Sequence, residues 1–557
     1  MSSNFTTFIF FYFAIITSTV GYGSFVANIA NLKNTHYNKG YLGLFGVFFL
    51  IFYSYISHFF ISHNYTNNLI VLTLGLIFFI YFFEKKNKKE YILLYLFFLI
   101  LFIGFVIFKT HDDFPYYHFP YTYYLTQNNL LIGVGNFNHG FRTPSSIFYL
   151  NSLFYLPIVK YYFFHIGAIM IMGFSSLVLL DYIYKKIKKK NTDIIFFLSL
   201  MSFVFINIFF YRIGEHGTDR SAQILIFLLI IELIILINMN SQFRENSTIF
   251  FVLLTLVISL KSYYILYLIL LFPIFYYFVK NKKFFYFNDF FKNPFFYLST
   301  LIFIFILLIN FFNSGCLIYP LKITCFENFS WSIPLQEVSR MNDWYEQWSK
   351  GGAGPTFRVD NPEAYIQKFN WVDNWINVYF FNKVSDFIYG IIFLSVVVFI
   401  TFYSKDNKAM YHHKGIVLIY FMLVLIFIEW FYNHPALRYG GYPLIALLLF
   451  LPIAWHLSKK YYLNFNIKIR AYFLIFLTLS VFVGRNFNRL HNEEQQYKYK
   501  PLKKINYLVS NNYFRIQNNF EDIIKINNGC INQLDYCDKH KDLNMKKKYS
   551  YIIFFRK

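Results

Sequence analysis

Long apolar runs dominate this sequence, and they restrict the chain to few folds. A helix that crosses a bilayer needs roughly 20 mainly apolar residues, and about fourteen runs meet that rule. A backbone in lipid must also satisfy its own hydrogen bonds, which favours helices. The sequence therefore predicts an all-α, polytopic transmembrane helical bundle of about 12–14 helices. The runs lie near residues 7–30, 41–61, 68–83, 91–108, 161–184, 193–211, 222–238, 248–260, 262–279, 295–312, 386–403, 415–432, 441–458 and 470–484.

The composition agrees with a membrane body. The chain is 57% hydrophobic and 14% charged, whereas soluble domains carry about 25% charged residues. The net charge of +23 does not imply a nucleic-acid partner, because lysines of membrane proteins gather in cytoplasmic loops and near anionic lipids. Residues 8–22 lack a basic n-region and a clear cleavage site, so we expect a retained helix. The runs around Lys261 form either two short helices or one broken helix.

The lysines predict which side each loop faces. With the N-terminus outside, the inside loops include EKKNKKE (84–90), KKIKKK (185–190) and KNKK (280–283). Lysine clusters on one side are what the positive-inside bias requires. We therefore expect a multi-pass protein of the cytoplasmic membrane, with the lysine-rich loops in the cytoplasm and the other loops outside.

This topology leaves three large parts outside. They are a loop at 109–160, a loop at 313–385 and a C-terminal tail at 485–557. The tail is rich in Lys and Arg, but long segments translocate largely regardless of charge. We expect a multi-helix membrane domain over 1–484 and a small helical extramembrane cap over 485–557.

The cysteines form two close pairs. They are Cys316 with Cys325, and Cys530 with Cys537, and both pairs fall in segments that the lysines place outside. Disulfides persist in such oxidising surroundings. Neither pair has the short C-x-x-C spacing of zinc ribbons. The sequence favours two disulfides, and four unrelated thiols are the alternative.

The first external loop opens with two adjacent carboxylates, Asp112 and Asp113, in KTHDDFPYYHFPY (109–121). Ionisable groups at a membrane interface are costly, which favours a function for them. Low-dielectric surroundings raise a carboxylate pKa, and this suits a general base. The pair can instead cap a following helix, with Pro115 in its first turn. It can also bind a divalent cation, but two adjacent acids do not define a site, so no metal ligand is assigned.

Two further segments gather polar residues on the same side. The stretch RIGEHGTDRSAQ (212–223) crowds four of them at a helix start, more than a plain turn needs. The glycines of this stretch allow a close approach of the backbone. In GVGNFNHGFRTPSS (133–146), His139 and Arg142 are candidates, although an ordinary surface turn explains each alone. The four residues of the first stretch are Glu215, His216, Asp219 and Arg220.

Two cationic positions complete the set. Lys261 separates two apolar segments, where a lysine either snorkels to the interface or holds a phosphate as a point charge. His434 and Arg438 stand in YNHPALRYGGYPLIALLL (432–449), just before a helix. Arginine suits bidentate phosphate contact, and an interfacial anchor is the alternative. Carboxylates, cations and histidines at one surface predict a site for an anionic group and a proton transfer.

These motifs resemble the GT-C superfamily of membrane glycosyltransferases. The likeness rests on the acidic pair in the first large external loop and on HPALRYGGYPLI, which is similar to a His/Arg-Tyr-Pro element near the late helices of such enzymes. The strings HDDFPYYHFPY, GEHGTDRSAQ and SGCLIYPLKITCF also look like those of bacterial membrane proteins grouped near them. One difference is that about four apolar runs precede the acidic loop here, whereas it follows the first helix in many members.

The resemblance implies a polyprenyl-phosphate-linked sugar as donor and a glycan or lipid as acceptor. Asp112 or Asp113 would be the general base, and the other acid would orient the acceptor. Arg438, Lys261 and Arg220 would hold the lipid phosphate. The acceptor or phosphate pocket would be completed by Glu215, His216 and Asp219.

Three other functions stay open. An O-antigen type polymerase or ligase also has many helices and Arg/His chemistry on lipid-linked sugars. A transporter or flippase predicts charges at midspan and repeated halves, and neither is evident. A non-enzymatic scaffold gives no reason for polar clusters on one face. The tryptophans of the second loop either stack on sugars or lie at the membrane interface; they are Trp331, Trp344, Trp348, Trp371 and Trp375.

Overall fold

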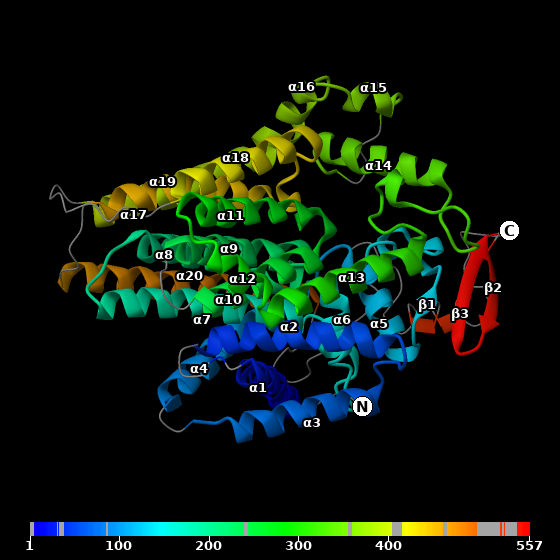
Figure 1. Cartoon of the computed structure of the whole chain (residues 1–557), viewed down its shortest axis with the longest axis horizontal. Coiled ribbons are helices and arrows are strands. Elements are labelled where there is room, and N and C mark those ends of the chain that lie inside the picture. The colour runs from blue at the N-terminus through cyan, green and yellow to red at the C-terminus, as the bar shows by residue number, and fades with distance from the viewer. Residues whose placement is uncertain are drawn as a thin grey trace.

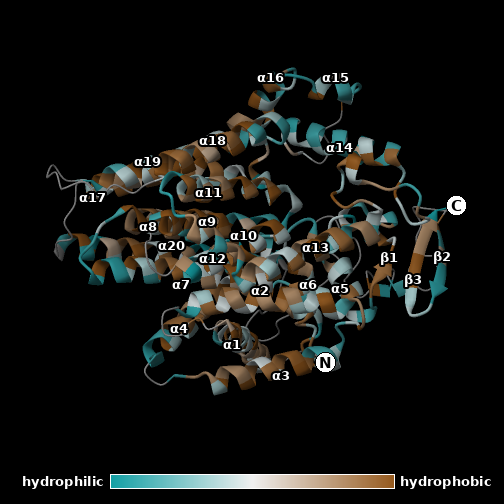
Figure 2. Ribbon diagram, viewed as in Figure 1, coloured by the Kyte–Doolittle hydropathy of each residue, from teal (hydrophilic) through white to brown (hydrophobic). Residues whose placement is uncertain are grey.

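A computed structural model of the 557-residue chain provides the structure. The long helices lie roughly side by side, and several short elements project beyond one end of the bundle (Figure 1). Apolar residues colour the length of the helices, and hydrophilic residues gather at their ends (Figure 2). The structure describes residues 5–30, 32, 38–84, 87–107, 109–238, 243–354, 359–403, 415–459, 465–497, 524–525, 528–529 and 543–556.

The bundle helices fall into three groups along the chain. The first group is α1 (Phe5–Ile29), α2 (Lys39–His58), α3 (Tyr65–Tyr81) and α4 (Lys88–Phe105). The second is α7 (Ile166–Lys188), α8 (Ile194–Phe209), α9 (Asp219–Asn238), α10 (Phe243–Leu260), α11 (Leu271–Lys280), α12 (Phe285–Phe291) and α13 (Pro294–Ser314). The third is α17 (Ser385–Phe402), α18 (Ile416–Asn433), α19 (Gly441–Ser458) and α20 (Phe465–Tyr497).

The predicted all-α polytopic bundle is confirmed. Within the described ranges, 11 helices are long and apolar enough to cross a membrane, judged by length and composition. Helices α3 and α8 are apolar but shorter. The chain is therefore a multi-pass membrane protein.

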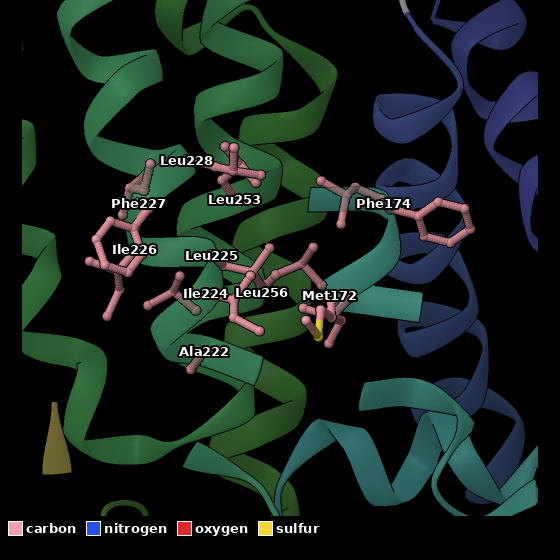
Figure 3. Close-up of a cluster of buried hydrophobic side chains, with 14 of the residues drawn as sticks. Met172, Phe174, Ala222, Ile224, Leu225, Ile226, Phe227, Leu228, Leu253 and Leu256 are labelled. Carbon is pink, nitrogen blue, oxygen red and sulfur yellow. The ribbon is translucent and has the colours of Figure 1, made fainter. Parts of the chain in front are cut away.

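Helices α7, α9 and α10 form the centre of the bundle. Their apolar windows are 83–89% buried, whereas the window of α13 is only 22% buried. Met172 of α7 lies among Leu225 of α9 and Leu256 of α10 (Figure 3). A helix that is apolar on every side fits such a central position. The outer helices leave apolar side chains to face lipid.

Glycines let α1 approach its neighbours closely. A Cβ atom at Gly23 would lie 1.7 Å from the carbonyl oxygen of Leu42 on α2, and one at Gly21 would lie 1.9 Å from that of Gly75 on α3. Small residues are the usual means of close helix packing in membranes. A larger residue at either position must push these helices apart.

The chain breaks at Lys261. Helix α10 ends at Leu260, and a 3-10 helix (Ser262–Leu270) leads into α11. Lys261 itself has an extended backbone, with φ −155° and ψ 126°. The two runs around this lysine are therefore separate helices, and the lysine lies in the turn between them.

Two loops and the C-terminal strands build the projecting part. The first loop holds a π-helical turn (Phe114–His118), α5 (Phe119–Gln127), β1 (Leu131–Ile132) and α6 (Ser146–Ser152). The second holds α14 (Leu335–Lys350), α15 (Pro362–Ile366) and α16 (Val372–Trp375). A disulfide joins Cys316 to Cys325 at its start, as predicted. Cys530 and Cys537 lie outside the described residues.

The described end of the tail is not helical, so the expected helical cap is wrong there. Strands β2 (Leu543–Lys548) and β3 (Tyr551–Arg556) pair antiparallel, and β3 also pairs parallel with β1. Phe554 of β3 is fully buried, because β1 of the first loop offers the strand an edge and an apolar neighbour. Helix α20 also continues to Tyr497, past the predicted boundary at 484.

Candidate functional site

Arg438 lies in the turn that joins α18 to α19, and two tryptophans hold this turn. The indole N–H groups of Trp375 and Trp430 donate to the carbonyl oxygens of Pro435 and Ala436, both at 3.0 Å. Buried indole groups usually find such a partner. The backbone beside Arg438 is thus fixed against the bundle.

Arg438 connects two carboxylates from distant parts of the chain. Its Nη2 donates to Oδ2 of Asp113 at 3.0 Å, and its Nε donates to Oδ2 of Asp219 at 3.2 Å. Nζ of Lys261 lies 2.6 Å from Oδ1 of Asp219. We call Asp113, Arg438, Asp219 and Lys261 the ion-pair network. The Asp219 side chain is 5% exposed and the other three are 24–27% exposed, so the network is partly accessible.

Asp113 precedes the π-helical turn, and its side chain faces Arg438. The backbone carbonyl of Asp113 accepts the N–H groups of Tyr117 at 3.0 Å and His118 at 3.3 Å. The Asp113 carboxylate makes no capping hydrogen bond to this turn. The capping alternative therefore does not describe Asp113.

A backbone hydrogen bond ties the first loop to the turn before α9. The N–H of His111 donates to the carbonyl oxygen of Gly214 at 3.1 Å. Gly217, with φ +56°, leaves so little space beside His111 that an added Cβ would lie 3.1 Å from the imidazole ring. This close packing brings Asp113 and Asp219 to the same guanidinium.

The electrostatics keep Asp113 ionised. Burial raises the pKa of Asp113, but Arg438, His111 and His118 lower it by more, and the result lies below the ordinary value. This corrects the expectation that the interface raises its pKa. Burial lowers the pKa of Arg438, yet Asp219 and Asp113 raise it well above the ordinary value, so Arg438 stays charged.

Burial also keeps the nearby histidines neutral. It is the largest cause of the lowered pKa of His111, to which Arg438 adds. The pKa of His118 is lowered further, by burial and by His111. Neutral imidazoles can accept a proton or bind a metal ion.

Aromatic rings line the cationic side of the network. The guanidinium carbon of Arg438 lies 5.4 Å from the ring centre of Trp348 on α14, and Nζ of Lys261 lies 5.2 Å from that of Tyr439. Tyr117 donates a hydrogen bond to Oδ2 of Asp113 at 3.4 Å. The rings of Trp348 and Tyr439 add cation–π attraction to the two cations.

The structure brings together one member of each of the main predicted clusters. Asp113, Asp219, Lys261 and Arg438 meet directly. The ring of His434 lies 5.8 Å from that of Tyr439, which Lys261 also contacts. Asp112 is exposed beside Asp113. The convergence inferred from the lysine pattern is therefore a contact between side chains.

The other residues of the 212–223 stretch point elsewhere. Glu215 pairs with Arg489 of α20 at 2.6 Å. Nε2 of His216 bonds to the carbonyl oxygen of Phe210 at 2.6 Å. The guanidinium of Arg220 lies over the rings of Phe210 and Tyr442. These three residues position the turn and do not join the network.

Arg142 and His139 also lie apart from the network. Arg142 donates to the Tyr319 hydroxyl at 2.6 Å and forms an ion pair with Glu337, which also holds Arg556 of β3. Arg142 thus links the first loop, the second loop and the tail. His139 packs between Tyr116 and Trp344, with ring centres 6.0 Å away in each case.

His111 and His118 lie in the quoted segment 109–121, but the sequence pattern assigned them no role. Their ring centres lie 5.6 Å apart. One ring nitrogen of each histidine and one carboxylate oxygen of Asp113 lie within 4.8 Å of one another. The spacing of two histidines around an aspartate could have marked them. The π-helical turn that brings the two imidazole rings together has no clear signal in the sequence.

An apolar groove lies beside the turn that carries Arg438. Its volume is about 570 Å³, and it opens between the third group of helices and the segment before α17. Trp375 and Trp430, which hold the turn, also form part of its wall. The lining residues are Val372, Trp375, Ile376, Phe380, Phe381, Val384, Ile388, Phe427, Trp430, Phe431, Ile445 and Leu448.

The chain matches a protein family over most of its length. The sequence model of a family described as "Domain of unknown function (DUF8201)" matches residues 6–445. This stretch includes all four residues of the ion-pair network. No curated protein and no solved structure matches the chain.

Proposed function

The chain belongs to the DUF8201 family, and we propose that it is a membrane glycosyltransferase. It moves a sugar from a polyprenyl-phosphate donor to a glycan or lipid acceptor on the outer face of a bacterial cytoplasmic membrane. The observation that supports this most is the ion-pair network, in which Arg438 and Lys261 bracket a buried carboxylate beside an apolar groove.

The two cations suit a lipid phosphate. Arg438 already presents Nε and Nη2 to carboxylate oxygens, and a guanidinium binds phosphate oxygens with the same fork. Lys261 adds a second positive charge next to Asp219. A phosphate that binds here competes with Asp113 for Arg438.

The groove suits the lipid chain of the same molecule. Its described walls are aromatic and aliphatic side chains only, and such a surface gains free energy from each buried CH₂ group. The turn bearing Arg438 contacts the groove wall through Trp375 and Trp430. A ligand with a charged head and an apolar tail matches both parts.

The reaction forms one bond and breaks another. The acceptor hydroxyl oxygen bonds to the anomeric carbon, and the bond from that carbon to the phosphate oxygen breaks. Polyprenyl phosphate leaves, while Arg438 and Lys261 stabilise its developing charge. Asp113 takes the hydroxyl proton. Once the phosphate has drawn Arg438 away, the pKa of Asp113 rises, and the carboxylate becomes a better base.

The acceptor enters from the side of the second loop. Trp344 and Trp348 are one helical turn apart on α14, and Trp348 lies against Arg438. Aromatic rings of this kind can stack on a sugar. Trp331, by contrast, packs on Phe311 and Phe329, and Trp371 is fully buried. Only α14 therefore supplies candidates for acceptor contact among these tryptophans.

The experiment measures donor turnover in proteoliposomes. The full-length chain is supplied with radiolabelled monosaccharides on polyprenyl phosphate and with an extract of membrane lipids and glycans. We expect label to leave the donor with the parent and not with Asp113→Asn, whereas Asp112→Asn is the matched neighbour control. Thermal melting confirms that each variant is folded.

Other outcomes identify other functions. Consumption of diphosphate-linked oligosaccharides, with monophosphate donors untouched, indicates a polymerase or ligase. Movement of intact labelled lipid between leaflets without loss of sugar indicates a flippase. If the folded parent consumes no lipid-linked sugar, the glycosyltransferase proposal is wrong.

A further inference from the structure

The first external loop contains a second candidate site beside the ion-pair network. We propose that His111, Asp113 and His118 bind a divalent transition-metal ion of the zinc class. Nδ1 of His111 lies 3.6 Å from Oδ2 of Asp113, and the ligand atoms of all three residues lie within 4.8 Å of one another. This inference concerns metal binding and does not depend on the proposed transfer reaction.

The backbone arranges the three ligands. The π-helical turn makes the N–H of His118 bond to the carbonyl oxygen of Asp113 at 3.3 Å. This five-residue step places the His118 ring over His111, with 21° between the ring planes. Single π-helical turns are often found at functional sites.

His118 offers a buried ring nitrogen as a metal ligand. The residue is 4% exposed, and its Nε2 has no hydrogen-bond partner among the described residues. A buried polar atom without a partner destabilises the folded chain. A bound ion would supply the missing partner.

A small cavity lies against the same imidazoles. Its volume is about 20 Å³, and its lining includes His111, His118, His165, Thr122 and Asn151. A space of this size holds a single ion or a single water molecule. Asp113 is not among its lining residues, so the cavity adjoins the two histidines and not the carboxylate.

The types of ligand indicate which class of metal ion would bind. Two imidazoles and one carboxylate match Zn²⁺ and neighbouring transition metals, whereas Mg²⁺ and Ca²⁺ prefer oxygen ligands. Three protein ligands with one open position are typical of catalytic zinc. Arg438 and Tyr117 both contact Oδ2 of Asp113, and a carboxylate has a second oxygen for the ion. The backbone N–H of Asp113 donates to Nδ1 of His111 at 3.0 Å, and an ion on that nitrogen replaces this bond.

The ion and the reacting proton would compete for Asp113. In the proposed transfer, Asp113 accepts the hydroxyl proton, and a carboxylate bound to Zn²⁺ is a weaker base. Saturating Zn²⁺ should therefore slow transfer, and a chelator should restore it. The opposite result, in which chelation abolishes transfer, would make Asp113 a metal ligand during catalysis and leave the metal site intact.

Metal binding is tested directly on the full-length chain. The protein is purified without a polyhistidine tag, stripped with a chelator and titrated with Zn²⁺ alone, and bound metal is measured by mass spectrometry. We expect one equivalent of Zn²⁺ per chain, and tetrahedral absorption bands when Co²⁺ replaces it. His118→Gln should weaken binding by at least about 100-fold. The exposed His491→Asn in α20 is the control, and it should bind as the parent does.

A second variant keeps the test decisive. His111 is more exposed than His118, so His111→Gln should fold even if His118→Gln does not, and it too should lose the ion. The proposal is overturned if the folded parent binds no Zn²⁺, or if both variants retain the parent's affinity.

Discussion

The guanidinium of Arg438 contacts the carboxylate of Asp113 at 3.0 Å, although 325 positions separate the two residues in the chain. The same guanidinium contacts Asp219 at 3.2 Å. One arginine from a late turn thus connects the first loop to the start of a central helix. A pair of this kind makes the charge of Asp113 depend on whatever else binds Arg438.

The first prediction separates the two acids of the pair. Asp113→Asn should lower the rate of sugar transfer by about 10²- to 10⁴-fold, the usual contribution of a general base. Asp112→Asn should retain most of the activity, because Asp112 is exposed and the network contacts Asp113. Single-turnover kinetics on lipid-linked donor measure the effect. Equal losses in both variants would show that the loop, rather than one carboxylate, is required.

The second prediction concerns the donor phosphate. Arg438→Lys keeps the charge but removes the fork that contacts two carboxylates. Loss of such a contact costs at least about 2 kcal/mol, which raises KM for the donor roughly thirtyfold. We expect kcat to fall as well as KM to rise, because Arg438 also stabilises the charge that develops on the leaving phosphate, whereas Asp113→Asn should act mainly on kcat. A lower kcat with unchanged KM in Arg438→Lys would show that Arg438 does not contribute to donor binding.

The third prediction follows from the charge of Asp113. Its pKa lies below the ordinary value of 3.8, so the unfolded chain binds a proton at this group more readily than the folded chain does. The stabilisation from ionised Asp113 is therefore complete above the unfolded pKa, and it is lost as the pH falls toward the folded pKa. Thermal unfolding of the parent and Asp113→Asn, from about pH 7 to about pH 3, should show a constant difference that shrinks only below about pH 4. A difference that shrinks near neutral pH would point to a histidine.

The sequence located the ion-pair network only in part. Asp113, Asp219, Lys261 and Arg438 could be selected because they stand beside apolar runs and away from the lysine-rich loops. The lysine-rich loops also predict that all four lie on one face. Which side chains meet depends on how the helices pack, and no local pattern reports that. Glu215 and Arg220 flank Asp219 closely in the chain, yet a short 3-10 turn and the start of α9 point them in other directions.

Strand β3 was not predictable for a related reason. YIIFFR is too short and too apolar to distinguish a strand from a buried helical turn. Its partner β1 is only two residues long and lies in a loop near the other end of the chain. The pairing is therefore a property of the tertiary fold, and so is the ion pair between Arg556 and Glu337.

The fourth prediction tests this strand. Phe554→Ala should destabilise the projecting part by about 3 kcal/mol, as for other buried Phe residues, because Phe554 is fully buried and its ring lies 4.5 Å from that of Phe137. Limited proteolysis should then cut the external loops faster while the bundle stays intact. Tyr549→Ala is the control, since Tyr549 is 87% exposed at the turn of the same hairpin. Equal protease resistance of the parent and Phe554→Ala would show that β3 does not support these loops.

The fifth prediction concerns the side of the membrane on which the ion-pair network lies. Cys325 is paired with Cys316 at the start of the second loop, and Lys189 is exposed in the lysine-rich loop after α7. In a background with Cys530→Ser and Cys537→Ser, a membrane-impermeant maleimide should label right-side-out vesicles at Cys325 only after reduction. Lys189→Cys should be labelled only in inverted vesicles. The reversed pattern would place Asp113 and Arg438 in the cytoplasm, where a disulfide would not persist, and would remove the external donor from the proposed reaction.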